Sequence, residues 1–335
     1  MISLRKNKIG YIYGIAILLL LLAAVLGVLF GSSELRLSDM LSSLIAGDMQ
    51  SPEARILLYV RLPRVLGSLI CGMALAVPGA VIQGVLANRL ASPSIIGVNA
   101  GAGLAVTIGS ALGIIGGWRL SLFAFVGAFL TVMLVSLGAR TWGASRGTVI
   151  LMGVALNALL GAISDTVTTF NPEISIQSLD FKIGDFSSVT YAKLIPATVI
   201  VLISVLILLT FSNELDVLTL GDENAKGLGM NTNVMRVIFL LLSALLAGAA
   251  VSVCGLLSFV GLLVPHAVRR ISTSESKHLL PLCALFGAGF VSLCDTLARV
   301  VFAPYELPVG IIMAFLGAPF FIFILIKGKG GHRNA

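Results

Sequence analysis

The chain has 335 residues, of which 58% are hydrophobic and only 11% are charged. A soluble domain usually has about 25% charged residues, so the composition excludes an ordinary soluble protein of this length. The net charge of +7 does not indicate nucleic-acid binding, because no basic run is interleaved with aromatic residues and membrane proteins gather basic residues in cytoplasmic loops.

Apolar stretches of about 20 residues recur along the chain, and each could cross a bilayer core as a helix. Because the bilayer core holds no water for backbone groups, the spans must be helical, which predicts an all-α polytopic membrane protein. The first apolar run is too long for a typical signal peptide and is interpreted as a retained span. The ten predicted spans are 11–30, 62–87, 94–115, 119–140, 147–170, 190–211, 234–254, 257–270, 279–302 and 307–326.

Ten spans place both termini on one side of the membrane. With that side in the cytoplasm, most of the 22 Lys and Arg residues fall in cytoplasmic segments, as the positive-inside rule requires. We therefore expect one permease domain over 1–335, with external connections at 31–60 and 171–189 and a cytoplasmic segment at 212–233. The connection 171–189 is expected to contain short helices and turns.

A weak repeat relates the two halves of the chain. The segment LGSLICGMALAVPG (66–79) aligns with LLSALLAGAAVSVCG (241–255), and LFAFVGA (122–128) aligns with LCALFGA (282–288). Spans 2–5 then correspond to spans 7–10 with opposite orientation, and inverted repeats of this kind are typical of transporters.

The nucleotide-binding motif GxxxxGK[ST] is absent, and neither HExxH nor GxSxG lies within a predicted span. The four cysteines lie in apolar runs without a CxxC pair and are interpreted as small buried hydrophobes. Asp165 and Asp295 are expected near outer span ends, within reach of water. A carrier driven by protons or sodium would place ionisable groups in mid-membrane, so the energy for any transport should come from a partner.

Four segments resemble, in order and spacing, the iron-chelate and vitamin B12 permease family of ABC importers. They are RLPRVLGSLICGMALAVPGAVIQGVLANRLASPSIIGVNAGAG (61–103), LTLGDENAKGLGM (218–230), GLLSFVGLLVPHAVRRI (255–271) and DTLARVVFAPYELPVGIIMAFLGAPFF (295–321). The resemblance implies a ten-helix subunit that pairs with a second permease subunit. It also implies two ATPase subunits inside, which hold ATP and Mg²⁺, and a substrate-binding protein outside, while this chain itself holds no cofactor or metal.

The segment LGDENAKGLG resembles the coupling helix that seats on the ATPase in this family. A short polar helix between two glycines could act as a rigid lever on two membrane helices, although a solvated loop is the simpler reading of the residues alone. The expected ATPase contacts are Gly221, Asp222, Glu223, Asn224, Ala225 and Lys226.

Three arginines stand at family positions associated with docking of the external binding protein: Arg61, Arg64 and Arg299. They are expected to be exposed, because an exposed guanidinium can pair with a carboxylate through two parallel hydrogen bonds. The alternative is that each arginine merely reaches the lipid headgroups.

Asn88 and Leu90 match the loop that closes the channel on the cytoplasmic side in this family. A narrow ring of such residues could block a large solute between transport cycles. The alternative is an ordinary turn, with Asn88 as a cap and Pro93 opening the next helix.

The segment FVGLLVPHAVRR (259–270) matches the family's eighth helix. Pro265 should bend or start a helical stretch, and Arg269 and Arg270 should anchor its cytoplasmic end. His266 is expected near the inner surface, hydrogen-bonded to a neighbouring loop. A metal ligand or proton relay is the alternative, but no second His or carboxylate stands beside it at ligand spacing.

Two departures from the family pattern concern the bend and the substrate. Gly255-Leu256-Leu257-Ser258-Phe259 replaces the common Gly-Pro-Ile-Gly-Phe, which leaves the local bend open. Phe181 and Lys182 stand where relatives often have tryptophan near the outer mouth, which leaves the substrate open.

The sequence is therefore identified as the membrane subunit of an ABC importer for an iron chelate, as a homodimer in the cytoplasmic (inner) membrane of a prokaryote. Ferric siderophore, haem and cobalamin are the candidate substrates, in that order. A secondary transporter would share the repeat but would need ionisable residues in mid-membrane. A membrane enzyme or structural subunit would need a catalytic constellation or would lack the coupling segment.

Overall fold

The computed structural model describes residues 2–32, 42–43, 45–141 and 146–329, and these residues form helices joined by turns and irregular segments, without a β-strand. Residues 33–41 and 44 of the predicted external connection 31–60 lie outside the described residues. The all-α prediction is confirmed.

The elements are α1 (Ile2–Leu29), α3 (Pro52–Ile56), the π-helix η1 (Leu57–Arg61), α4 (Leu62–Val85), α5 (Val98–Ala111), α6 (Gly117–Thr141), α7 (Arg146–Phe170), α8 (Pro172–Gln177), α9 (Leu179–Ile183), α10 (Tyr191–Thr210), α11 (Ser212–Thr219), α12 (Asp222–Gly227), α13 (Thr232–Cys254), α14 (Val260–Ile271), α15 (Ser276–Val300) and α16 (Val309–Lys329).

Among the described residues, seven helical segments are long and apolar enough to cross a membrane, and they coincide with seven of the predicted spans. The other three predicted spans coincide with α16 and with two short helices, α5 of 14 residues and α14 of 12 residues. The second span begins earlier than expected, because Ser51 caps the chain at Pro52 and the helix continues through η1 into α4. Its cap is the hydroxyl of Ser51, which accepts a hydrogen bond from Ala54 N.

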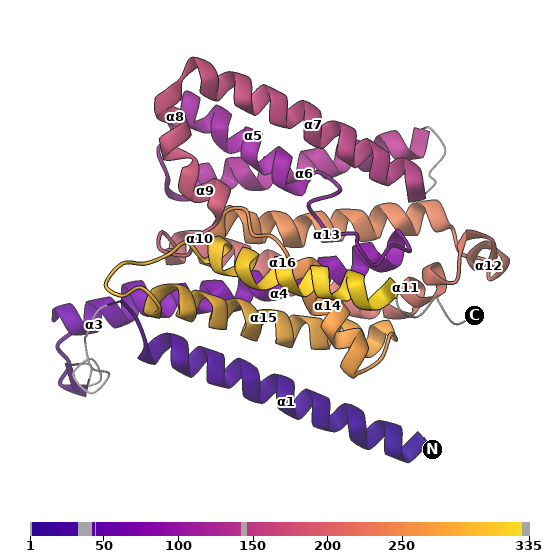
Figure 1. Ribbon diagram of the computed structural model, residues 1–335, viewed down its shortest axis with the longest axis horizontal. Helices are drawn as coiled ribbons and strands as arrows, with labels where there is room; N and C mark the ends of the chain where they lie inside the picture. Colours follow the sequence, from indigo (N-terminus) through magenta and orange to yellow (C-terminus); the bar gives the residue numbers. More distant parts are fainter. Residues whose placement is uncertain (1, 33–41, 44, 142–145, 330–335) are drawn as a thin grey trace.

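The helices α4, α13 and α15 form the centre of the bundle, with α1, α6, α7 and α10 around them (Figure 1). More than 70% of the apolar window is buried in each central helix, against 17% in α7 and 22% in α1. A Cβ atom on Gly72 would overlap the carbonyl oxygen of Gly287, so α4 and α15 are in backbone contact. Small residues allow the two backbones to approach. The resulting van der Waals contact holds the helices together, because lipid is as apolar as the side chains and supplies no hydrophobic driving force.

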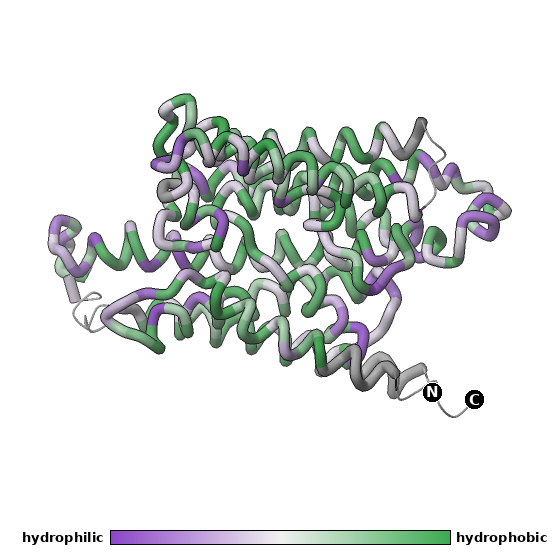
Figure 2. The backbone as a smooth tube through the Cα atoms, turned by 45° about the horizontal axis from the view of Figure 1, so that its top comes forward, coloured by the Kyte–Doolittle hydropathy of each residue, from purple (hydrophilic) through white to green (hydrophobic). Residues whose placement is uncertain are grey.

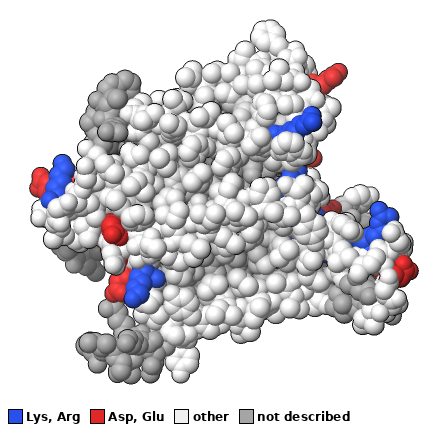
Figure 3. All heavy atoms as spheres, turned by 180° about the vertical axis from the view of Figure 1, so that it is seen from behind, with Lys and Arg blue, Asp and Glu red and all other residues white. Residues whose placement is uncertain are grey.

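Polar residues gather at the two ends of the bundle. Figure 2 shows an apolar middle between two hydrophilic ends, and Figure 3 shows a face whose charged side chains lie at the ends, with an uncharged band between them. One end carries α3, α8 and α9 and is called the α9 end; the other carries α11 and α12 and is called the α12 end (Figure 1). The helix α1 begins, and α16 runs out, at the α12 end.

A broken helix stands at the same place in each half of the chain. The long helix α4 is followed by an irregular segment that ends in Gly97, with φ of 96°, before the short α5. The long helix α13 is followed by 255–259, which ends in Phe259, with φ of 69°, before the short α14. The bend at 255–259 is therefore present without the family's proline, because Gly255 adopts φ of 74° and ends α13.

The backbone contact between α4 and α15 should make stability sensitive to one methyl group. Gly72→Ala is expected to lower the free energy of unfolding by about 1–3 kcal/mol, because neither backbone can yield without moving a helix. The measurement is the thermal unfolding midpoint of the purified protein in detergent. Gly161→Ala is the control, since a Cβ at Gly161 of α7 meets nothing within 4 Å. Equal midpoints for the two variants would contradict the contact.

Candidate functional site

The coupling segment projects at the α12 end as the paired short helices α11 and α12 (Figure 1). Gly221 has φ of 106°, a conformation that favours glycine, and precedes α12 directly. Glu223, Asn224 and Lys226 are exposed, as an ATPase contact requires. Ala225 is fully buried, so the prediction that it contacts the ATPase is wrong for the conformation described here.

Asp222 also turns towards the membrane helices instead of outwards. Its carboxylate accepts hydrogen bonds from Nη2 of the buried Arg236, at 2.9 and 2.8 Å, and a longer one of 3.4 Å from Arg146. Burial alone would raise the pKa of Asp222, but the hydrogen bond from Arg236 and the charges of Arg236, Arg146 and Lys226 outweigh it, so the pKa is lowered. A lowered pKa means that this pairing stabilises the segment at neutral pH and is lost as the pH falls through the lowered value.

The partner helix α11 is tied to the bundle separately. Asp216 accepts hydrogen bonds from the backbone nitrogen of Ser276, at 3.0 Å, and from its hydroxyl, at 2.6 Å. Nη2 of Arg146 donates to the carbonyl oxygen of Leu218 at 3.0 Å. The two short helices are therefore hydrogen-bonded to α7, α13 and α15. A displacement of the short helices would be transmitted to these three membrane helices.

The three predicted docking arginines are buried, with exposed fractions of 3% for Arg61, 4% for Arg64 and 2% for Arg299. The prediction that they are exposed is wrong. Asp295 was expected within reach of water, but it is 0% exposed, so that prediction is also wrong. Burial of these charges requires partners inside the protein, because an unpaired buried charge costs several kcal/mol.

Two of the arginines cap the end of α1. Nη1 of Arg61 donates to the carbonyl oxygens of Val28 and Leu29, at 2.9 and 3.0 Å. Arg299 donates to the carbonyls of Gly27 and Phe30, at 3.1 and 3.0 Å. The last carbonyls of a helix have no partner within it and carry the negative end of its dipole, so guanidinium groups satisfy both needs.

The third arginine forms the centre of a charge network. Nε of Arg64 lies 3.1 Å from Oδ1 of Asp295, whose Oδ2 lies 3.1 Å from Nε of Arg299. Nη1 of Arg64 donates to Glu306, in the connection between α15 and α16, and Glu306 also accepts from the hydroxyl of Ser32 at 2.6 Å. Burial alone would raise the pKa of Glu306, but these hydrogen bonds and the arginine charges outweigh it, so the pKa is lowered.

The predicted gate loop is a tight turn after α4. Asn88 donates its backbone N–H to the carbonyl of Gln83 at 3.1 Å, and its side-chain Oδ1 accepts from Leu90 N at 2.9 Å. Leu90 is exposed at 46%. Asn88 therefore stabilises a turn, as the alternative interpretation expected. The next helix, α5, begins at Val98, so the expectation that Pro93 opens it is wrong.

The helix α14 contains Pro265 and ends with the two arginines. Arg270 is exposed, as an anchor at the membrane surface would be, but Arg269 turns inwards and donates to the carbonyl of Ala80 on α4 at 3.3 Å. The expectation that Arg269 anchors the helix at the surface is corrected accordingly. His266 is partly exposed and its imidazole makes no hydrogen bond with the described residues, so the expected bond to a neighbouring loop is not found.

The described residues contain no group of three or more His, Cys, Asp or Glu side chains that could hold a metal ion. The positive charges nearest His266 are those of Arg89, Arg269 and Arg270. Three guanidinium groups disfavour a cation beside this imidazole by simple repulsion.

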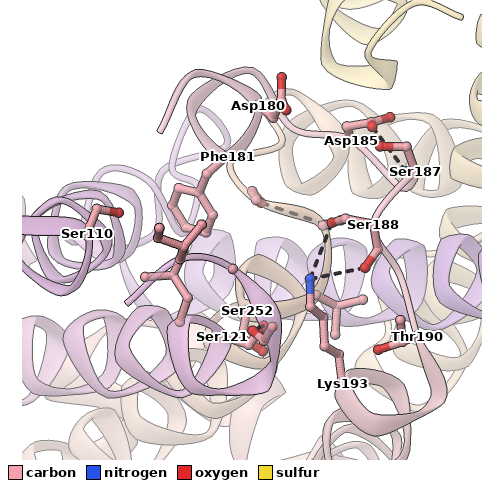
Figure 4. A pocket seen from close by; sticks show the side chains of 17 residues that line it. Ser110, Ser121, Asp180, Phe181, Asp185, Ser187, Ser188, Thr190, Lys193 and Ser252 are labelled. Atoms are coloured by element: carbon pink, nitrogen blue, oxygen red, sulfur yellow. Dashed lines mark hydrogen bonds between the residues drawn. The ribbon is translucent and has the colours of Figure 1, made fainter. Parts of the chain in front are cut away.

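A cavity of about 430 Å³ opens at the α9 end, and sequence reasoning singled out Phe181 and Gly255 of its lining without predicting a cavity (Figure 4). Its polar lining includes the hydroxyls of Ser110, Ser121 and Ser252. Nζ of Lys193 donates to the carbonyl and the hydroxyl of Ser188, at 3.1 and 3.3 Å. The signal that could have indicated this cavity is Lys193, a charged residue near the start of the apolar helix α10.

The long apolar helices, with charged side chains at the two ends of the bundle, are those of a multi-pass membrane protein. The chain belongs to the FecCD transport family, which it matches over residues 18–327. The resemblance drawn from the four sequence motifs is confirmed.

Several characterised relatives are permease components of ABC importers. The chain is 36% identical to the Fe(3+)-citrate import system permease protein YfmD of Bacillus subtilis, over 97% of each chain. It is 36% identical to the hemin transport system permease protein HmuU of Yersinia pestis, over 82% of this chain and 84% of the relative. It is 34% identical to the vitamin B12 import system permease protein BtuC of Yersinia enterocolitica, over 88% and 90%.

A solved structure described as an inward-facing metal-chelate type ABC transporter has the same fold. It superposes with a TM-score of 0.83 at 29% identity, and the alignment covers 95% of this chain and 99% of that one.

The pairing of Asp222 with Arg236 should hold α12 on the bundle. Asp222→Asn is expected to raise amide hydrogen exchange over residues 222–227 about tenfold, because it removes the charge that faces a buried guanidinium. The measurement is hydrogen–deuterium exchange with mass spectrometry at neutral pH. Glu223→Gln removes an equal charge from the exposed face of α12 and should leave exchange unchanged. Equal exchange in both variants would refute the anchoring role.

Proposed function

We propose that the chain is the membrane-spanning subunit of an ABC importer that moves an iron chelate into the cytoplasm of a prokaryote. The observation that supports this most is the 36% identity with the Fe(3+)-citrate permease over nearly the whole of both chains. In this proposal two copies of the chain form the pathway between them. Two ATPase subunits hold ATP and Mg²⁺ on the cytoplasmic side, and a substrate-binding protein delivers the chelate from outside.

The ATPase contact falls on the exposed face of α12. Glu223, Asn224 and Lys226 supply polar groups there, and Leu228 supplies an apolar contact at 68% exposure. A groove of about 310 Å³ lies beside it, lined by Glu214, Val217, Leu228, Gly229, Met230, Asn231, Val234 and Met235. The α12 end is then cytoplasmic, and both chain termini lie on that side.

Closure of the ATPase pair would push α11 and α12 towards the membrane. The push passes to α13 through Asp222 and Arg236, and to α15 through Asp216 and Ser276. The bundle responds by alternating access, in which the space between the two copies opens to one side at a time. The turn at Asn88 and Leu90 closes the cytoplasmic side between cycles.

The preferred substrate in this proposal is a ferric siderophore, followed by haem and then by cobalamin. Relatives of similar identity carry names for iron citrate, hemin and vitamin B12, so identity alone does not separate these chelates.

Uptake by intact cells tests this function directly. Deletion of the chain is expected to abolish uptake of radioactive iron supplied as one ferric siderophore complex, with uptake restored by the gene in trans. Haem and cobalamin are supplied to the same cells in parallel. Unchanged uptake of all three compounds would overturn the proposed function. Loss of cobalamin uptake alone would overturn the assignment of an iron chelate as the substrate.

Docking of the binding protein needs a step that the sequence did not suggest. Arg64 is occupied by Asp295 and Glu306, with Asp185 at 3.8 Å, and the Glu306 side chain is 30% exposed. An acidic residue of the binding protein would therefore have to displace Glu306 from Arg64 by carboxylate exchange. Asp295 stays in place in this scheme because it is enclosed.

Carboxylate exchange predicts an unusual sign for one variant. Glu306→Gln should strengthen binding-protein affinity about three- to tenfold, because Arg64 loses the exchangeable one of its internal carboxylates. The measurement is biolayer interferometry with the protein in nanodiscs, and Glu173→Gln on α8 removes a carboxylate at the same end as the control. Weaker binding by Glu306→Gln would mean that Glu306 supports the docking surface and would overturn the exchange.

A further inference from the structure

Gln83 is a buried polar residue in the last turn of α4, with an exposed fraction of 3%. An amide inside a membrane protein is costly unless its donor and its acceptor are both satisfied. The partners of Gln83 come from α14, which follows it by about 180 residues in the chain. Neither the coupling segment nor the predicted gate residues explain this contact.

Pro265 creates the need that the Gln83 side chain meets. Proline has no backbone N–H, so the carbonyl of Gly261, four residues earlier in α14, has no intrahelical donor. Nε2 of Gln83 donates to that carbonyl at 3.1 Å. The opposite atom of the same amide, Oε1, accepts from Nη1 of Arg269 in the last turn of α14. One side chain therefore holds α14 at both of its ends.

The backbone of Gln83 holds the turn that follows α4. Its carbonyl accepts the N–H of Asn88 at 3.1 Å, and the turn closes on itself through Ala91 N and the carbonyl of Asn88 at 3.0 Å. Ala91 is fully buried in this arrangement. The turn and α14 are thus joined through a single residue.

The packing leaves little freedom for α14 to move without disturbing Gln83. A Cβ on Gly79 would overlap the carbonyl oxygen of Gly261, so α4 and α14 touch at the backbone. A Cβ on Gly261 would lie 3.1 Å from Cδ of Pro93, so the segment after the turn packs against the same point. Beyond Ile271 the chain turns into α15, whose Ser276 is held by Asp216 of α11.

We propose that Gln83 is a positioning residue that latches the 87–91 turn to α14, so that the turn is released when α14 moves away from α4. The assignment of that turn as the cytoplasmic gate rests on the proposed function, whereas the latch itself concerns contacts within one chain. Its test therefore needs no ATPase, binding protein or substrate.

The test measures opening of the turn with a buried reporter cysteine. Ala91→Cys places a thiol in the closed turn, and its rate of labelling by a water-soluble maleimide reports how often the turn opens. The four native cysteines are buried, and the chain without the reporter gives their background. Ala225→Cys, in the fully buried position on α12, is the second reporter, because general loosening would raise both rates. The full chain is studied in nanodiscs.

Gln83→Leu is expected to raise labelling at position 91 about tenfold and to leave labelling at position 225 unchanged. Gln83→Glu keeps an acceptor for Arg269 but loses the donor to Gly261, so its increase should be smaller. Ser68→Ala is the matched control, because in the part of the chain that the structure describes the Ser68 hydroxyl bonds only to the carbonyl of Val65 within α4. Arg269→Met should raise the rate at 91, and its combination with Gln83→Leu should add nothing beyond the larger single effect.

Three results would overturn the latch. They are an unchanged rate at 91 in Gln83→Leu, an equal rise at 91 and 225, and a double variant whose effect is the product of the single effects. If Gln83→Leu does not fold, Gln83→Glu and Arg269→Met carry the same comparison. Unchanged uptake of all three compounds after deletion of the chain would overturn the proposed function and leave these labelling rates unaffected, so the two failures are distinguishable.

Discussion

Backbone contact between α4 and its neighbours is the constraint on which the rest of the structure depends. Gly72 brings α4 against α15, and Gly79 brings it against α14. In lipid no hydrophobic force holds apolar helices together, so van der Waals contact over small residues must do so. This closeness in turn fixes which polar groups can meet. Gln83 reaches Gly261 only because the helices touch one turn earlier, and Arg64 lies on the same helix, near Asp295 of α15.

The buried charges at the α9 end follow from the same closeness. Two guanidinium groups share Asp295, and the remaining donors of Arg299 reach the last carbonyls of α1. Removing charge from water is unfavourable unless geometry and hydrogen bonds compensate for it, and here they largely do. The network also joins α1, α4 and α15 to the connection that holds Glu306. The α9 end is therefore braced by charge, while the centre is held by packing.

The sequence predicted the features that depend on local pattern. The long apolar runs gave seven of the spans, and Gly221 with the polar run after it gave α12 at its observed position. It failed where the partner is remote in the chain. The burial of Arg64 was missed because its carboxylate partner, Asp295, stands 231 residues away and no local pattern joins them. The third span was drawn too long for a similar reason, since the carbonyl of Ser94, in its irregular first residues, accepts a hydrogen bond from Asn157 of α7.

Those irregular segments show how such a bundle can hold one arrangement and still change it. One backbone group of 255–259 is satisfied by a remote part of the chain, because Leu256 N donates to the carbonyl of Phe181 at 2.8 Å. At the next bend Pro265 removes one helical hydrogen bond, and Gln83 replaces it from another helix. A helix whose backbone is completed by a neighbour cannot move alone, because the carbonyl it leaves behind would be unsatisfied. Apolar faces in lipid can slide at little cost, so the few directional bonds at α12, at Gln83 and at Arg64 decide which helices move together.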